Sequence, residues 1–162
     1  VFHAKIADAA FPVLCANVRP QRGGPLGVRS HVVLERAGLR IALFGLTVPM
    51  VTERSAARIA WDMLFDDPVA CAASLVPTLR RDADLVIALT HIGVAQDRRL
   101  VGAVPGIDLV VSGHSHVVYP QPEVVDGVPT LQAGSHARFY GHAVFDGARM
   151  LDYALRPLED AP

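Results

Sequence analysis

Two apolar runs in this chain each lead into histidine, and this constrains the fold more than any other feature. Residues 85–89 precede Thr90 and His91, and residues 107–111 precede Ser112 and a Gly-His-Ser-His segment that holds His114 and His116. Runs of four to eight apolar residues predict strands buried on both faces of a parallel sheet. Ligands bind beyond the carboxyl ends of such strands. We therefore expect His91, His114 and His116 to meet at one sheet edge and to bind metal there.

Composition and charge predict neither a membrane span nor a nucleic-acid partner. The chain has 162 residues, of which 51% are hydrophobic, and its formal net charge is −1. Its longest near-continuous apolar stretch, residues 41–51, is interrupted by Gly45, Thr47 and Pro49. Because a spanning helix needs about 20 apolar residues, no membrane span is predicted. The basic residues are scattered, so no nucleic-acid polymer is expected as a partner.

The first part of the chain predicts a helix followed by strands. Residues 2–10 have the pattern of the last turns of an amphipathic helix, which leads into a strand over residues 11–16. Since a domain rarely begins inside an element, we expect the chain to be truncated. Alternating residues 28–35 and the apolar run 40–48 predict a hairpin.

The middle of the chain predicts a helix, a strand, a helix and a strand. Asp67 and Pro68 are typical of a helix start, and apolar residues at helical spacing continue to about Asp82. Pro77 is expected to kink or break this helix. A short helix over residues 97–103 separates the two histidine-bearing strands, which predicts a parallel pair with a right-handed crossover.

The last third of the chain changes in character. Asp126-Gly127 and Asp146-Gly147 are hairpin turn signals between short apolar runs. They predict an antiparallel meander after His116. Residues 1–162 are therefore expected to fit one α/β domain.

Four segments carry a family resemblance. They are residues 11–17 (FPVLCAN), 90–93 (THIG), 104–116 (VPGIDLVVSGHSH) and 131–135 (LQAGS). In this order they resemble the second half of the calcineurin-like metallophosphoesterases, and most closely the branch of the 5′-nucleotidases and UDP-sugar hydrolases. The resemblance covers nearly the whole chain.

The resemblance implies a fold and a metal site. The fold is a sandwich of two mixed β-sheets flanked by helices, with four αββα layers in a complete domain. The activity is phosphoester hydrolysis at two divalent metal ions, for which Mn, Zn, Co and Fe all suit imidazole ligands. By resemblance, His91 and His114 hold one ion and His116 holds the other. Asp108 is expected to fix local structure rather than to bind metal.

The chain also departs from the family pattern. The family's Asp-x-His, Gly-Asp and Gly-Asn-His-Glu motifs are absent, and the only asparagine is Asn17, which precedes valine. Residues 1–162 are therefore expected to be the carboxyl-terminal part of one catalytic domain, without a nucleotide-specificity domain. No catalytic residue is assigned in this chain, which we expect to be inactive alone.

Other residues and functions have competing interpretations. His136 follows the fourth segment; it could lie near the site, but loop packing is favoured. Asn17 is assigned to a turn, and Arg80 and Arg81 to the end of their helix. A histidine-triad nucleotide-binding protein would need histidine at Val118. A non-catalytic remnant that acts as an interaction module stays open, as do a cyclic-nucleotide phosphodiesterase and a sulfur-compound hydrolase. The resemblance favours a nucleotide or related phosphoester substrate and an exported protein.

Overall fold

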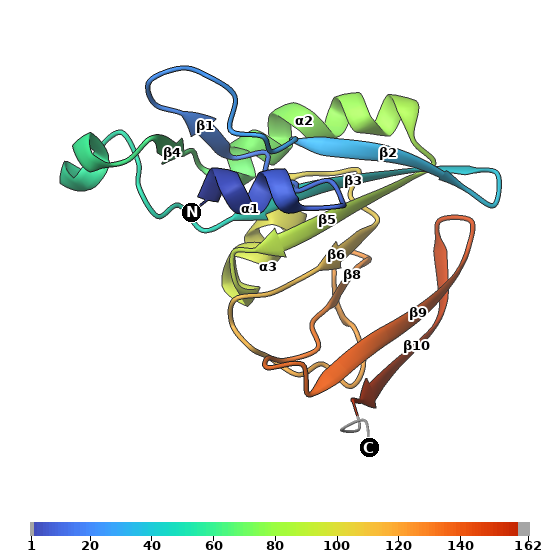
Figure 1. Cartoon of the computed structure of the whole chain (residues 1–162). Helices are drawn as coiled ribbons and strands as arrows, with labels where there is room; N and C mark the ends of the chain where they lie inside the picture. The colour runs from blue at the N-terminus through green and yellow to red at the C-terminus, as the bar shows by residue number, and fades with distance from the viewer. Residues whose placement is uncertain (1, 159–162) are drawn as a thin grey trace.

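A six-stranded mixed sheet forms the centre of the molecule (Figure 1). The computed structural model describes residues 2–158. The strands lie in the order β2 (His31–Arg36), β3 (Leu39–Thr47), β5 (Leu85–His91), β6 (Leu109–Val111), β8 (Val128–Leu131) and β7 (Glu123–Val125). The four central strands are parallel, and the two outer strands, β2 and β7, pair antiparallel with their neighbours. The predicted α/β class, hairpin and parallel pair are confirmed.

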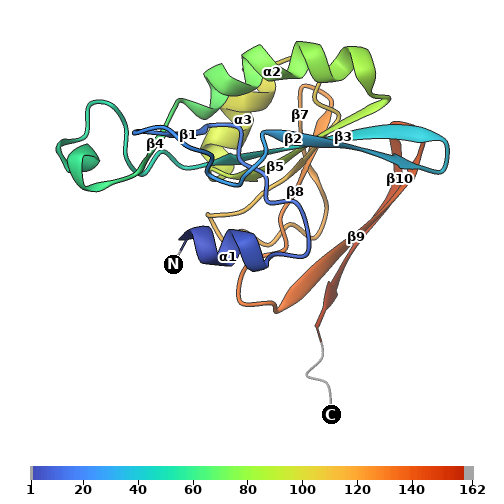
Figure 2. The same ribbon diagram turned by 45° about the horizontal axis from the view of Figure 1, so that its top comes forward.

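Helices α2 (Pro68–Asp82) and α3 (Val94–Ala103) lie on the same face of this sheet (Figure 2). Helix α2 begins as predicted, because the Asp67 carboxylate accepts a hydrogen bond from the Ala70 amide at 2.8 Å. Its buried side chains, Val76 among them, pack with Phe44 of β3 and Leu100 of α3 in one hydrophobic core. None of the helices in residues 2–158 is both long and apolar enough to span a membrane.

Pro77 does not break α2, which runs without interruption from Pro68 to Asp82. Pro77 and Ala73 are both exposed. The proline ring removes the amide that would bond to the Ala73 carbonyl. Because this carbonyl lies on the solvent side of the helix, water can satisfy it. The prediction of a break was therefore wrong.

The amino-terminal elements are shorter than predicted. Helix α1 spans Phe2–Asp8, and the strand expected over residues 11–16 is reduced to one isolated parallel bridge between Leu14 and Arg29. Two short strands that were not predicted, β1 (Val18–Pro20) and β4 (Met63–Phe65), pair antiparallel away from the main sheet. The helix expected to begin near Asp97 begins three residues earlier, at Val94.

The last third is not a meander. Strand β8 pairs parallel with β6, and only β7 and β8 form an antiparallel pair in this part of the main sheet. Strands β9 (Phe139–Asp146) and β10 (Arg149–Pro157) form a separate two-stranded sheet, which leans away from the main sheet in both views (Figures 1 and 2). Tyr153 packs with Leu109 and Leu131 in a second apolar cluster. The pairing of β8 with β6, which passes over β7 in the sequence, cannot be predicted from the local alternation of apolar and polar residues.

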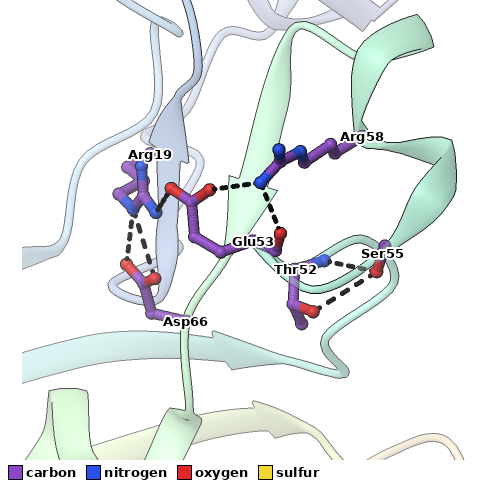
Figure 3. Close-up of polar contacts among 6 residues, drawn as sticks. All are labelled: Arg19, Thr52, Glu53, Ser55, Arg58 and Asp66. Atoms are coloured by element: carbon purple, nitrogen blue, oxygen red, sulfur yellow. Dashed lines mark hydrogen bonds and ion pairs between the residues drawn. The ribbon is translucent and has the colours of Figure 1, made fainter.

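A network of charged side chains fastens the segment between β3 and β4 to β1 (Figure 3). Glu53 lies between Arg19, at 2.6 Å, and Arg58, at 3.4 Å, and Arg19 also pairs with Asp66 at 3.1 Å. These groups are exposed to solvent, so each pair contributes about 1 kcal/mol or less to stability. The network shapes a surface loop that includes the 3-10 helix η1 (Ala56–Ala60).

Asn17 joins three segments of the chain. Its side chain is fully buried, and its amide nitrogen donates to the Thr47 carbonyl at 2.8 Å and the Asp66 carbonyl at 3.1 Å. Its amide oxygen accepts a bond from the Thr47 amide at 2.9 Å. Asn17 lies in a turn, as predicted, and its side chain also fixes the end of β3 to the segment before α2.

Asn17→Ala should lower the free energy of unfolding by about 1–3 kcal/mol, because it leaves partly buried backbone groups of Thr47 and Asp66 without these partners. Ser74→Ala is the control, since that exposed hydroxyl bonds only within α2 and its loss should change stability by less than about 0.5 kcal/mol. Urea denaturation measures both variants. Equal stability of the two would show that the Asn17 bonds are not needed.

Candidate functional site

His91 and His114 lie side by side at the carboxyl edge of the parallel strands. His91 is the last residue of β5, and His114 lies in the loop after β6. Their ring centroids are 5.1 Å apart and the rings meet edge to face at 73°. Both side chains belong to exposed residues. The parallel register pairs Leu89 with Val111, two residues before His91 and Gly113, so it brings both loops to the same level.

Two glycines make this close approach possible. A Cβ atom at Gly113 would lie 2.9 Å from Nδ1 of His91, and one at Gly93 would lie 3.2 Å from Cδ2 of His114. Gly93 also has a φ of +84°, which glycine adopts without strain. Side chains at these positions would push against the two imidazole rings.

His116 lies beside His136. Their ring centroids are 5.9 Å apart. The loop that carries His116 is fastened to the segment after β8 by a bond from the Gly134 amide to the Val117 carbonyl at 2.9 Å. His136, which had been assigned to loop packing, therefore adds an imidazole next to a predicted ligand. Its position shortly after a parallel strand is the sequence signal for this placement.

The histidine loops have strained backbones. His114, His116 and His136 have φ values of 75°, 57° and 58°. This left-handed conformation is uncommon for residues other than glycine, and it concentrates at functional sites. The loops are therefore held in shape by the surrounding structure.

A buried carboxylate lies beneath the two loops. Asp97 of α3 is 1% exposed and accepts bonds from the Thr90 hydroxyl at 2.7 Å and from the Ser112 hydroxyl at 2.5 Å. Burial raises the pKa of Asp97, and the two hydroxyl bonds act in the opposite direction. From the sequence, Asp97 was expected only to begin a helix.

Gln132, directly after β8, continues this polar network. Its amide nitrogen donates to the Ser112 hydroxyl at 2.7 Å, and its amide oxygen accepts a bond from the Val117 amide at 2.6 Å. The side chain is 2% exposed. Gln132 therefore connects the beginning and the end of the Gly-His-Ser-His loop.

Asp108 has the structural role that was predicted. It lies at the opposite end of β6 from the histidines, pairs with Arg80, and accepts a bond from the Val86 amide at 2.7 Å. Arg80 also donates to the carbonyls of Ala83 and Asp84, at the end of α2. Both residues therefore fix α2 against β5 and β6.

The donor set fits a divalent metal in part. Neutral imidazole nitrogens are ligands for Zn, Mn, Fe and Co, and the contact between His91 and His114 brings two of them together. Within residues 2–158, no group of three or more histidine, cysteine, aspartate or glutamate side chains is arranged to hold an ion. The convergence of His91, His114 and His116 on metal stays a prediction.

Comparison with known proteins gives relatives of one kind. No family model matches the chain. It is 27% identical over 135 residues to the uncharacterized metallophosphoesterase YunD of Bacillus subtilis, a match that covers 82% of this chain and 28% of YunD. It is 32% identical over 120 residues to the trifunctional nucleotide phosphoesterase YfkN of the same organism, a match that covers 71% of this chain and 8% of YfkN.

Solved structures agree with these relatives. The crystal structure of a 5′-nucleotidase precursor from Thermus thermophilus matches with a TM-score of 0.75 and 25% identity, over 96% of this chain and 35% of that one. The chain thus spans about a third or less of the length of these relatives. The shared sequence and fold place it among the calcineurin-like metallophosphoesterases, as a homologue of the 5′-nucleotidases.

Proposed function

We propose that this chain is the carboxyl-terminal part of a metallophosphoesterase catalytic domain that hydrolyses nucleotides or related phosphoesters. The contact between the His91 and His114 rings, 5.1 Å apart at the carboxyl edge of β5 and β6, carries this proposal. This contact brings two imidazole rings to the edge where open α/β sheets bind their ligands, and imidazole is a common ligand of divalent metals. The names of the relatives support a nucleotide substrate, and the family resemblance supports an exported protein.

The histidines have separate roles in this proposal. His91 and His114 hold one divalent ion through neutral ring nitrogens, and His116 holds the other. Bound ions of this kind activate water and stabilise charge on the phosphoryl group. His114 and His116 lie two residues apart in one loop, and the left-handed backbone at both positions sets the direction in which each ring leaves that loop. Mn, Zn, Co and Fe each suit such ligands.

The remaining parts of the active centre are proposed to come from other residues of the whole protein. The chain supplies imidazoles but none of the carboxylate-bearing motifs expected upstream in the family. The β9–β10 hairpin forms a two-stranded sheet of its own, on which Tyr140, Val144 and Leu151 are 43%, 40% and 56% exposed. Apolar residues exposed on both strands suit a sheet that is extended or covered by further chain.

In the whole protein, His91→Ala or His114→Ala should reduce nucleotide hydrolysis by more than about 100-fold, since changes to residues that only support metal ligands already cost roughly 10–100-fold. The loss of a ligand should also lower the metal content of the purified protein. His142→Ala is the matched control, because this exposed histidine lies on β9, outside the histidine loops.

Steady-state assays with AMP, together with metal analysis of the same samples, measure both effects. Wild-type turnover and metal content in His91→Ala or His114→Ala would refute the assignment of these residues. An equal loss in His142→Ala would show that the effect is not specific to the site.

The 162-residue chain alone should not hydrolyse phosphoesters at a useful rate. Without a bridging carboxylate, two cations a few ångströms apart repel each other strongly in a partly desolvated site, so a metal pair should not assemble. The assay uses AMP and a generic aryl phosphate with added Mn²⁺ or Zn²⁺, beside His114→Ala. Metal-dependent hydrolysis that disappears in this variant would show that the chain contains a complete site.

A further inference from the structure

Asp97 occupies an unusual position for a carboxylate. It is 1% exposed, lies in the first turn of α3, and has no cation among its hydrogen-bond partners. Burying a charged group in this way is costly unless hydrogen bonds compensate. The two bonds that it accepts come from residues that immediately precede the two histidine loops, which gives the carboxylate a specific location in the site.

The first bond fixes the end of β5. The Thr90 hydroxyl donates to Oδ1 of Asp97 at 2.7 Å, and Thr90 is itself 6% exposed. Because strand side chains alternate, a Thr90 side chain that points into the protein directs the next residue, His91, to the opposite side. The exposed position of His91 agrees with this arrangement.

The second bond fixes the loop after β6. The Ser112 hydroxyl donates to Oδ2 of Asp97 at 2.5 Å and accepts a bond from Gln132 at 2.7 Å. Ser112 precedes Gly113, where a Cβ atom would lie 2.9 Å from Nδ1 of His91. A shift of Ser112 would therefore move the backbone that lies against the His91 ring.

A third connection fixes the same loop to the beginning of α3. The Val94 amide donates to the Ser115 hydroxyl at 3.2 Å, and the Asp97 amide donates to the Gly93 carbonyl at 3.0 Å. Gly93 lies against His114. The turn that carries Asp97 thus contacts both loops through backbone as well as side chain.

We infer that Asp97 is a positioning residue that sets the His91 and His114 rings against each other, by holding Thr90 and Ser112 on the two oxygens of one carboxylate. The effect of Asp97 on the contact between the two rings can be tested in this chain without metal. The consequence for metal binding rests on the proposed function. A merely structural role, in which Asp97 anchors α3, would leave the ring contact unchanged when the carboxylate is removed and the chain stays folded.

The test compares variants of the 162-residue chain by NMR. The nuclear Overhauser cross-peak between the His91 and His114 ring protons reports their contact without any metal. Asp97→Ala should abolish this cross-peak, and Asp97→Asn, which keeps one acceptor oxygen, should weaken it. Arg98→Gln is the matched control on α3, because it removes the ion pair with Glu123 and leaves the histidine loops untouched.

Two further variants keep the test decisive if Asp97→Ala does not fold. Thr90→Val and Ser112→Ala each remove one of the two hydroxyl bonds, and each should reduce the same cross-peak. Gly113→Ala serves as a positive control, since its methyl group would displace the His91 ring directly. An unchanged cross-peak in the folded Asp97, Thr90 and Ser112 variants would overturn the inference, as would its equal loss in Arg98→Gln.

Metal binding supplies a second readout. In the whole protein, calorimetric titration with Zn²⁺ should give a dissociation constant about tenfold or more higher for Asp97→Asn than for wild type, with Arg98→Gln unchanged. Equal Zn²⁺ affinity in Asp97→Asn and wild type would overturn the metal consequence. Absence of Zn²⁺ binding to wild type would count against the proposed function, while the NMR result would still decide the role of Asp97.

Discussion

The parallel pairing of β5 with β6 is the constraint on which the rest of the site depends. It sends both strands out at the same edge and aligns His91 with the loop of His114. A parallel pair needs a crossover, and α3 makes this crossover on the face that also carries α2. The crossover helix thereby carries Asp97 to the underside of both loops. The parallel pairing of β5 with β6 therefore sets the positions of His91 and His114 and of the buried Asp97 carboxylate beneath them.

The strain in the loops is balanced by the network below them. Left-handed backbone at a residue other than glycine costs about 1–3 kcal/mol, and His114, His116 and His136 all adopt it. Such conformations persist only where neighbouring bonds determine them. Asp97, Ser112 and Gln132 supply such bonds, from three different segments, to the loop that carries His114 and His116. Among the described residues no buried side-chain nitrogen or oxygen lacks a partner. A rigid arrangement of this kind suits metal ligands, which must be held in place before the ion binds.

The parts of this structure that the sequence predicts are those set by local patterns. The apolar runs before His91 and His114, the hairpin of β2 and β3, and the start of α2 at Asp67 all follow from spacing and residue type. The pairing of β8 with β6 was missed because alternation does not reveal which strand a segment joins. Asp97 was missed for a related reason, since nothing in its neighbourhood shows that Thr90 and Ser112 come to it from two strands. The contact between the His116 and His136 rings was also missed, because a loop after a strand gives no local sign of which neighbouring loop it meets.

The central claim is that His91, His114 and His116 bind catalytic metal in the whole protein. Anomalous diffraction from crystals of that protein with Mn²⁺ or Zn²⁺, collected at the metal absorption edge, tests it most directly. Two peaks are expected, one within about 2.0–2.2 Å of ring nitrogens of both His91 and His114 and one at the same distance from His116. Metal peaks that lie elsewhere, with these three rings left without an ion, would contradict the claim.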